Sequence, residues 1–152
     1  TELNDERGNH FVEKGQEFGT VTKRRRRCGW FDSVLVKQSI AINGITNIVL
    51  TKLDVLDDLK EIKVCIGYDD GNKKYNYLPF DEKIQKNLFP IYETLPGWQS
   101  STYGLTSWND LPKNAQNYIN FLEKTIEKSI SIISTGPDRI HTIDRNNLLS
   151  NS

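Results

Sequence analysis

The feature that most constrains this fold is a strong helical pattern near the C-terminal end of the chain, followed at once by a strand pattern. In "NDLPKNAQNYINFLEKTIEK", residues 109–128, apolar side chains recur every three or four positions, at Leu111, Ala115, Tyr118, Ile119, Leu122 and Ile126. Pro112 suits the first turn of such a helix. The next residues, "SISIIS" (129–134), are apolar and β-branched and end at Thr135-Gly136-Pro137. A helix that leads directly into a buried strand favours an α/β architecture.

Two further helices are predicted in the N-terminal part of the chain. Asp32 is placed as an N-cap before the helical pattern of "SVLVKQSIAI" (33–42), and Gly44 after Asn43 provides a stop. Residues 2–18 carry a looser pattern, which two internal glycines weaken, with apolar positions at Phe11, Val12 and Phe18.

Strand patterns occupy the stretch between these helices and the C-terminal one. "ITNIVLTKL" (45–53) contains the short run Ile48-Val49-Leu50, which predicts a strand buried on both faces. "EIKVCIGY" (61–68) alternates, and this predicts that one face carries Ile62, Val64 and Ile66. Residues 69–72, "DDGN", predict a turn into a second strand, "KKYNYLP" (73–79), so we expect a β-hairpin.

The composition fits one folded domain or a piece of a larger protein, because 152 residues can bury one ordinary core. The 20 Lys+Arg are balanced by 20 Asp+Glu, which argues against a disordered tail. No apolar run approaches the roughly 20 residues that span a bilayer, so we expect a cytoplasmic protein with no membrane partner. Neither a disulfide nor a metal site is expected from the isolated cysteines and histidines, Cys28, Cys65, His10 and His141.

Against this neutral background, "TVTKRRRRCGW" (20–30) concentrates positive charge in one loop, with Lys23 followed by four arginines. One interpretation is a nuclear address or a nucleic-acid patch. However, proteins that neutralise many phosphates usually present a broad basic face, and only this loop is basic. The alternative is an anion clamp, because guanidinium forks and threonine hydroxyls between Gly19 and Gly29 suit a compact carboxylate or phosphate. The residues favour the clamp and leave nucleic-acid binding open.

Two other segments follow predicted strands, where ligands collect in open α/β sheets. In "TKLDVLD" (51–57), Asp54 can accept two hydrogen bonds from the N1–H and N2–H2 edge of guanine, while the stem of Lys52 lies along the base plane. A solvated strand end with a local ion pair explains the same residues. In "STGPD" (134–138), Gly136 lets backbone N–H groups approach a ligand closely, although an ordinary turn is equally consistent.

These three segments occur in order within longer strings: "GTVTKRRRRCGWFD", "INGITNIVLTKLDVLDDLKEIKVCIGY", "PIYETLPGW", "LPKNAQNYINFLE" and "IISTGPDR". Together the strings resemble the C-terminal portion of adenylosuccinate synthetase over nearly the whole chain. The resemblance implies the C-terminal part of a P-loop-NTPase-like mixed sheet flanked by helices, an α/β fold with a β-hairpin excursion. It also implies a cytoplasmic, homodimeric ligase that uses GTP and Mg2+ to join L-aspartate to IMP, giving adenylosuccinate, GDP and phosphate.

The resemblance further implies roles for single residues. Loop 19–29 matches the segment that closes over aspartate, through Thr20, Val21, Thr22, Lys23, Arg24, Arg25 and Arg26. Within it, Arg24 also reaches IMP, Arg26 contacts GTP, and Arg25 shares in gripping the aspartate carboxylates. Segments 51–54 and 134–136 match the guanine site, with Asp54 as the specificity carboxylate and with Lys52, Leu53, Ser134, Thr135 and Gly136 as further contacts.

Two departures from the family pattern qualify these expectations. The family commonly has two threonines and a glycine before the arginines, where this chain has Val21, Thr22 and Lys23. The chain also lacks the motif G-x-x-x-x-G-K-[ST] and the family's "GDEGKGK" loop, so we expect the catalytic residues and Mg2+ ligands to lie outside it and no turnover by it alone. Two alternatives stay open: a GTP-binding module without chemistry, and a basic-loop nucleic-acid binder with no ligase role.

Overall fold

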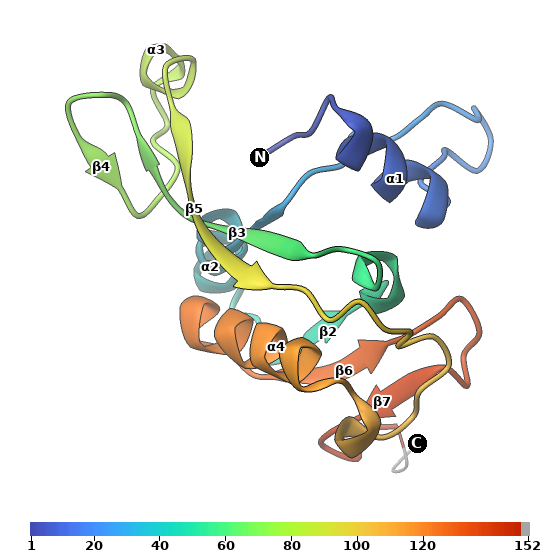
Figure 1. Cartoon of the computed structure of the whole chain (residues 1–152). Coiled ribbons are helices and arrows are strands. Elements are labelled where there is room, and N and C mark those ends of the chain that lie inside the picture. Colours follow the sequence, from blue (N-terminus) through green and yellow to red (C-terminus); the bar gives the residue numbers. More distant parts are fainter. Residues whose placement is uncertain (150–152) are drawn as a thin grey trace.

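The computed structural model describes residues 1–149, which form two small mixed sheets with helices packed against them (Figure 1). The first sheet is built around its longest strand, β3 (Glu61–Asp69). β1 (Phe31–Asp32) runs parallel to β3, whereas β4 (Lys74–Tyr75) and β5 (Phe89–Pro96) run antiparallel to it.

The second sheet has three strands, in the order β2 (Ile48–Leu50), β6 (Ile130–Ser134) and β7 (Thr142–Asp144). β2 is parallel to the central strand β6, and β7 is antiparallel to it. Helix-flanked mixed sheets confirm the expected α/β class, and the strands divide into two sheets. The parallel pairing of β2 with β6 brings the C-terminal ends of both strands to the same edge of the sheet.

The predicted helices form with the expected caps. The helical segments are α1 (Glu6–Lys14), α2 (Ser33–Asn43), α3 (Glu82–Gln85) and α4 (Lys113–Ile126), with short 3-10 turns at η1 (Leu53–Leu56) and η2 (Trp108–Asp110). The Asp32 carboxylate accepts a hydrogen bond from the Leu35 N–H at 3.1 Å, and Gly44 ends α2 with φ of 61°. Asp5 caps α1, which is shorter than the predicted range and ends before Phe18.

Helix α4 supplies the centre of the hydrophobic core, as its spacing predicts. The six apolar residues of the sequence pattern are all at most 4% exposed: Leu111, Ala115, Tyr118, Ile119, Leu122 and Ile126. Ile130 and Ile133 of β6 belong to the same core cluster. Full burial of each large aliphatic side chain contributes about 1.5–3 kcal/mol to stability. This core fixes the sheet edge on which the site is built.

The expectation that strand 48–50 is buried on both faces is wrong. β2 lies at the edge of its sheet and has a hydrogen-bonded neighbour on one side within residues 1–149. Ile48 and Leu50 are half-buried, while Val49 between them is 55% exposed. Alternate side chains of a strand point to opposite faces, and no described element covers the face of Val49.

The alternation predicted for β3 holds in its first half and then shifts. Ile62 and Val64 are buried, whereas Ile66 is 38% exposed. The pairing of β3 with β5 shifts register between Cys65 and Gly67, so a β-bulge turns Ile66 outward. Ile66 therefore does not share the buried face of Ile62 and Val64, which the alternation predicted for all three.

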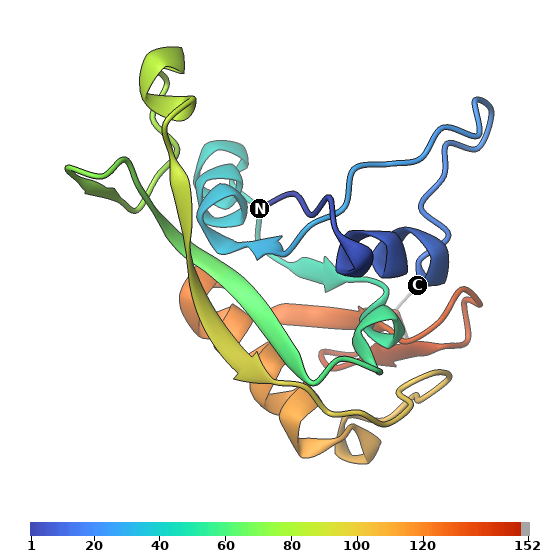
Figure 2. The ribbon, with the colours of Figure 1, turned by 45° about the horizontal axis from the view of Figure 1, so that its top comes forward.

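The predicted hairpin forms, but its second strand is much shorter than residues 73–79. β4 pairs with the end of β3 over two residues, after a turn at Gly71 with φ of 90°. The main partner of β3 is instead β5, which the sequence pattern did not reveal because prolines stand near both of its ends. Figures 1 and 2 show the distal part of this ribbon, with β4 and α3, projecting away from the rest of the molecule.

Candidate functional site

The two segments expected at a guanine site meet at one pocket. Because β2 and β6 are parallel neighbours, the residues that follow them emerge at the same sheet edge. A pocket of about 410 Å³ there is lined by Lys52 and Asp54 from one segment and by Ser134 and Gly136 from the other. The structure therefore brings these four predicted residues together, although they lie far apart in the sequence.

Leu53 and Thr135 belong to the same segments, but their side chains face the interior. Leu53 is 1% exposed and Thr135 is fully buried. The Thr135 hydroxyl donates a hydrogen bond to the Leu105 carbonyl at 2.8 Å, and the backbone N–H of Thr135 donates to the His141 carbonyl at 2.9 Å. Their side chains therefore hold the two segments in place and leave the pocket surface to their neighbours.

Asp54 and Lys52 have distinct environments within the pocket. Asp54 lies in the 3-10 turn η1, where partial burial raises the pKa of its carboxyl group. Lys52 has a left-handed backbone, with φ of 60°, and its Nζ donates to the Gly15 carbonyl at 2.5 Å. The pocket thus offers a carboxylate acceptor beside a lysine stem whose charged end is already held.

Gly136 occupies a position where a larger residue does not fit. A Cβ atom at this position would lie 2.6 Å from Nδ1 of His141 and 3.2 Å from a ring carbon of Tyr103. The His141 and Tyr103 rings pack edge to face, with 4.9 Å between their centroids. His141 Nδ1 is buried and has no hydrogen-bond partner among the described residues. The aromatic pair therefore packs closely against the turn at 134–136.

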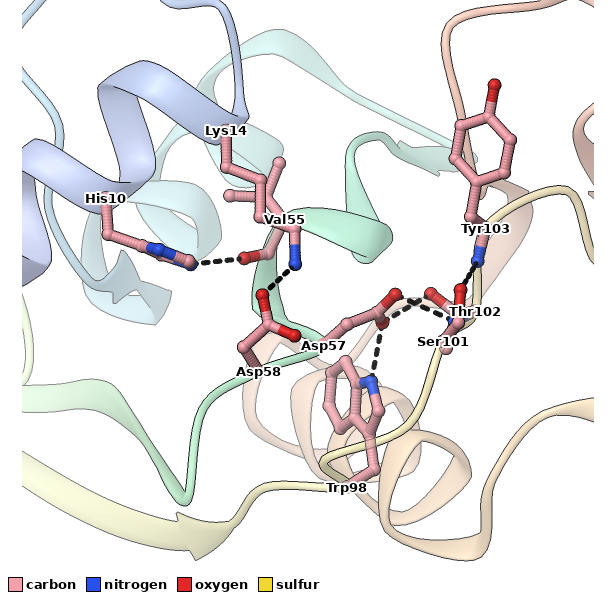
Figure 3. Close-up of polar contacts among 9 residues, drawn as sticks. All are labelled: His10, Lys14, Val55, Asp57, Asp58, Trp98, Ser101, Thr102 and Tyr103. Carbon is pink, nitrogen blue, oxygen red and sulfur yellow. Dashed lines mark hydrogen bonds and ion pairs between the residues drawn. The ribbon is translucent and has the colours of Figure 1, made fainter.

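The polypeptide around η1 is held by a buried carboxylate that the sequence analysis did not identify (Figure 3). Asp57 is 5% exposed and accepts hydrogen bonds from Trp98 Nε1, from the Thr102 N–H and from the Thr102 hydroxyl, each at 2.8 Å. His10 Nε2 approaches the Val55 carbonyl at 3.2 Å. These contacts tie η1 to the loop after β5 and to α1.

The end of α1 contributes residues to the same pocket that no sequence motif indicated. Lys14, Gly15 and Gln16 line it together with residues of the 134–136 turn. Lys14 Nζ forms an ion pair with Asp58 at 2.5 Å (Figure 3). Their sequence signal is weak, because Lys14 ends a helix, Gly15 and Gln16 follow it, and none of the three belongs to a motif.

The arginine loop, residues 19–29, is an exposed excursion with a short hydrogen-bonded stem. The Gly19 N–H donates to the Arg24 carbonyl at 2.8 Å, and the Arg26 N–H donates to the Glu17 carbonyl at 2.9 Å. Residues 20–27 are all exposed, and Figure 2 shows the loop after α1 standing away from the body of the molecule. Lys23 at its tip has φ of 56°.

The four arginines fall into two classes. Arg26 pairs with Glu17 at 3.0 Å, and Arg27 pairs with Glu2 at 2.5 Å. Within residues 1–149, Arg24 and Arg25 form no ion pair. Two guanidinium groups of the loop are therefore available to an external anion, and a third is linked to the pocket side of the molecule through Glu17.

The described residues contain no group of three or more His, Cys, Asp or Glu side chains arranged to hold a metal ion. Both cysteines, Cys28 and Cys65, carry free thiols. Among residues 1–149, no helix has the length and apolar character needed to cross a membrane.

Comparison with known proteins places this geometry in a family. A family model described as adenylosuccinate synthetase matches residues 1–143. The chain is 52% identical over 147 residues to the adenylosuccinate synthetase of Ehrlichia chaffeensis, and 51% identical over 145 residues to that of Coxiella burnetii. These matches cover 97% and 95% of this chain but 34% and 33% of the relatives, so the chain spans about a third of their length.

A solved structure shows the same relationship in three dimensions. The structure of fully ligated adenylosuccinate synthetase from Plasmodium falciparum matches with a TM-score of 0.89 at 38% identity, covering 95% of this chain and 35% of that one. The sequence match and the structural match thus both extend over almost the whole described chain, and this chain belongs to the adenylosuccinate synthetase family.

Proposed function

We propose that this chain is the guanine-binding and aspartate-binding part of an enzyme that ligates L-aspartate to IMP with conversion of GTP to GDP and phosphate. The observation that carries the proposal is the single pocket at which Lys52 and Asp54 meet Ser134 and Gly136. A carboxylate acceptor, a lysine stem and a closely approachable backbone are the features that a guanine base requires.

In the proposed site, Asp54 accepts hydrogen bonds from the N1–H and N2–H2 groups of guanine, and the Lys52 stem covers one face of the base. Ser134 and Gly136 contribute the opposite wall. Leu53 and Thr135 act through the backbone positions that their buried side chains maintain. This arrangement favours guanine over adenine, because adenine has no N–H donor at the corresponding ring position.

The arginine loop is proposed to close over L-aspartate, with Thr20 to Arg26 facing the substrates. Arg24 also reaches IMP, Arg25 grips the aspartate carboxylates, and Arg26 contacts GTP. The support is the environment of the loop: residues 20–27 are exposed, and Arg24 and Arg25 form no ion pair with any residue in 1–149. A dicarboxylate and two phosphorylated nucleotides bring much negative charge into one cleft, and the guanidinium groups offset it.

Two loop positions are proposed to alter aspartate binding in this chain. Val21, where the family commonly has a threonine, lacks a hydroxyl group and is 91% exposed. Lys23, where the family commonly has a glycine, has a left-handed φ of 56°, a conformation that glycine residues adopt without steric cost. The first change removes a hydrogen-bonding group, and the second restricts the loop.

The remaining parts of the proposal concern groups outside this chain. No residue within 1–149 is assigned to Mg2+, whose ligands we place with the catalytic residues in the part of the relatives that the chain does not match. This chain alone is expected to show no turnover. A homodimer and a cytoplasmic location remain expectations for the complete enzyme.

A chimera tests the guanine assignment. This chain would replace the matching 147-residue segment of the Ehrlichia chaffeensis adenylosuccinate synthetase, and GTP-dependent ligation of aspartate to IMP would be measured. Asp54→Asn should lower kcat/KM for GTP by about a hundredfold, because an amide oxygen cannot serve both N–H groups and the amide N–H2 opposes one of them. Asp110→Asn, an exposed change on η2, is the matched control. Unchanged preference for GTP over ATP in Asp54→Asn would exclude this role.

The arginine loop separates the ligase from the two alternative functions. In the same chimera, Arg25→Ala should raise the KM for aspartate by about tenfold or more, through the loss of a charge-assisted contact. A GTP-binding module without chemistry predicts no such effect. A nucleic-acid binder instead predicts that DNA or RNA competes with aspartate and that added salt abolishes the competition.

A further inference from the structure

Glu17 is the residue at which the arginine loop and the guanine segment meet. One carboxylate oxygen, Oε1, accepts from Lys52 Nζ at 2.5 Å, and the other, Oε2, accepts from Arg26 at 3.0 Å. The side chain of Glu17 is 21% exposed, whereas those of Lys52 and Arg26 are 46% and 57% exposed. The carboxylate is thus the most sheltered member of the three and lies between the two cations.

The backbone holds Glu17 firmly at this point. Its N–H donates to the Val12 carbonyl of α1 at 2.8 Å, and its carbonyl accepts from the Arg26 N–H at 2.9 Å. The adjacent residue, Phe18, forms an antiparallel bridge with Arg25. The Glu17 side chain therefore projects from a fixed point where the helix end joins the stem of the arginine loop.

This arrangement decides where the Lys52 side chain lies. Its Nζ is held both by Glu17 and by the Gly15 carbonyl, each at 2.5 Å. With its charged end tied to the stem of the arginine loop, the methylene stem lines the pocket beside Asp54. A lysine with a free Nζ would sample many rotamers in water and provide no fixed wall for a flat ligand.

The Glu17 carboxylate is charged under neutral conditions. Its hydrogen bond from Lys52, followed by that from Arg26, holds its pKa below the ordinary value of 4.5, although partial burial opposes the shift. Charge-assisted hydrogen bonds of this kind are stronger than neutral ones.

We propose that Glu17 is a positioning residue for the guanine base, which fixes the Lys52 stem as one wall of the pocket and joins that wall to the stem of the arginine loop. The inference rests on the proposed function of the pocket and adds a residue outside the segments that define it. Glu17 itself does not line this pocket or touch the base.

Binding of GDP to the chimera, measured by calorimetry, tests the proposal. Glu17→Gln should raise the Kd for GDP by about tenfold, the size expected for losing a charge-assisted hydrogen bond that holds a binding group. Lys52→Met keeps an apolar stem and removes the charge, and it should have a similar effect. Because Glu17 acts through Lys52, the double variant should bind GDP about as well as Lys52→Met alone.

A matched control and a substrate comparison distinguish positioning from general damage. Glu13→Gln removes a carboxylate from an exposed residue of α1 and should leave GDP binding unchanged. The KM for IMP should stay constant in Glu17→Gln while the KM for GTP rises. A general loss of folding would instead raise the KM values for both substrates together.

The possible outcomes separate this proposal from the proposed function. Full GDP affinity in Glu17→Gln, or additive losses in the double variant, would overturn the role of Glu17 while the ligase assignment stands. A chimera that binds GDP with the expected dependence on Glu17 but does not ligate aspartate to IMP would uphold the positioning role and refute the ligase. Failure of the unmodified chimera to bind GDP would refute both.

Discussion

At the scale of single residues, the site is marked by backbone conformations that L-amino acids rarely adopt. Gln16, Lys23 and Lys52 all have positive φ, at 50°, 56° and 60°. Non-glycine residues are held in such conformations when the surrounding structure imposes them, and these positions often cluster at ligand sites. Two of the three line the same pocket and the third is in the arginine loop, whereas the three other non-glycine residues with positive φ among residues 1–149 lie outside both.

The close packing under Gly136 gives a prediction at this scale. Gly136→Ala should lower the free energy of unfolding of the chain by about 1–2 kcal/mol, because the new Cβ would lie 2.6 Å from the His141 ring. In a His141→Ala background the same change should cost clearly less, because the obstructing ring is absent. Urea unfolding followed by tryptophan fluorescence measures both values. Equal losses in the two backgrounds would mean that His141 is not the obstacle.

At the scale of elements, connections between turns and loops shape the pocket as much as the sheets do. η1 carries Asp54, and its position depends on Asp57, which follows it directly. Asp57 reaches across to Trp98 and Thr102 in the loop after β5 (Figure 3). One buried carboxylate thus links the segment that carries the proposed guanine contact to the loop that follows the first sheet.

Replacement of this carboxylate should loosen the link. Asp57→Asn should lower the free energy of unfolding by about 3 kcal/mol, because the amide N–H2 would face donors and leave at least one of them without a partner. The adjacent Asp58→Asn is the matched control, since Asp58 is 70% exposed and forms one surface ion pair. Urea midpoints of the two variants provide the comparison. A loss as large in Asp58→Asn would remove the distinction between them.

At the scale of the whole molecule, acidic and basic residues are equal in number, but the basic residues are concentrated at 23–27. The chain carries 20 basic and 20 acidic residues, and nearby cations or hydrogen-bond donors lower the pKa values of several carboxyl groups: Glu2, Asp5, Glu17, Asp58, Asp70 and Asp144. Arg24 and Arg25 have no such partner within residues 1–149. Two guanidinium groups of the arginine loop are therefore not neutralised, whereas the next two arginines, Arg26 and Arg27, are paired with Glu17 and Glu2.

The lowered pKa values predict how stability depends on pH. A carboxyl group with a lowered folded pKa stabilises the fold above its ordinary value, 4.5 for Glu and 3.8 for Asp, and this contribution disappears as pH falls through the folded pKa. Asp54, whose pKa burial raises, has the opposite sign. The free energy of unfolding should therefore decrease from about pH 6 to about pH 3. Glu17→Gln should show a smaller decrease, and an identical pH profile would show that the Glu17 ion pairs do not stabilise the fold.

Comparison of sequence and structure shows which kinds of information were local. The spacing of apolar residues predicted α4, and Asp32 with Gly44 predicted both ends of α2, because caps and helical faces depend on residues within a few positions of one another. β5 was missed because its pairing depends on β3, many residues away, and its prolines weaken the local pattern. The exposure of Val49 and Ile66 likewise depends on the sheet edge and on the bulge.

The candidate site divides in the same way. Lys52, Asp54, Ser134 and Gly136 could be proposed from the sequence, because each follows a strand pattern and the strings that contain them resemble a known family. Glu17 and Asp57 could not, since a glutamate beside a basic run and an aspartate after a turn are common in any sequence. Their importance comes from contacts made across the fold.

The amino-acid sequence by itself determined the helices α1, α2 and α4, the order of the chemical groups and the family, because these depend on local spacing and on residue identity. Tertiary structure alone decided that the two segments proposed to bind guanine share one sheet edge, that Glu17 holds Lys52, and that Arg24 and Arg25 form no ion pair within residues 1–149. Parallel pairing and ion pairs join residues distant in the chain, and only the packed fold sets the distances between them.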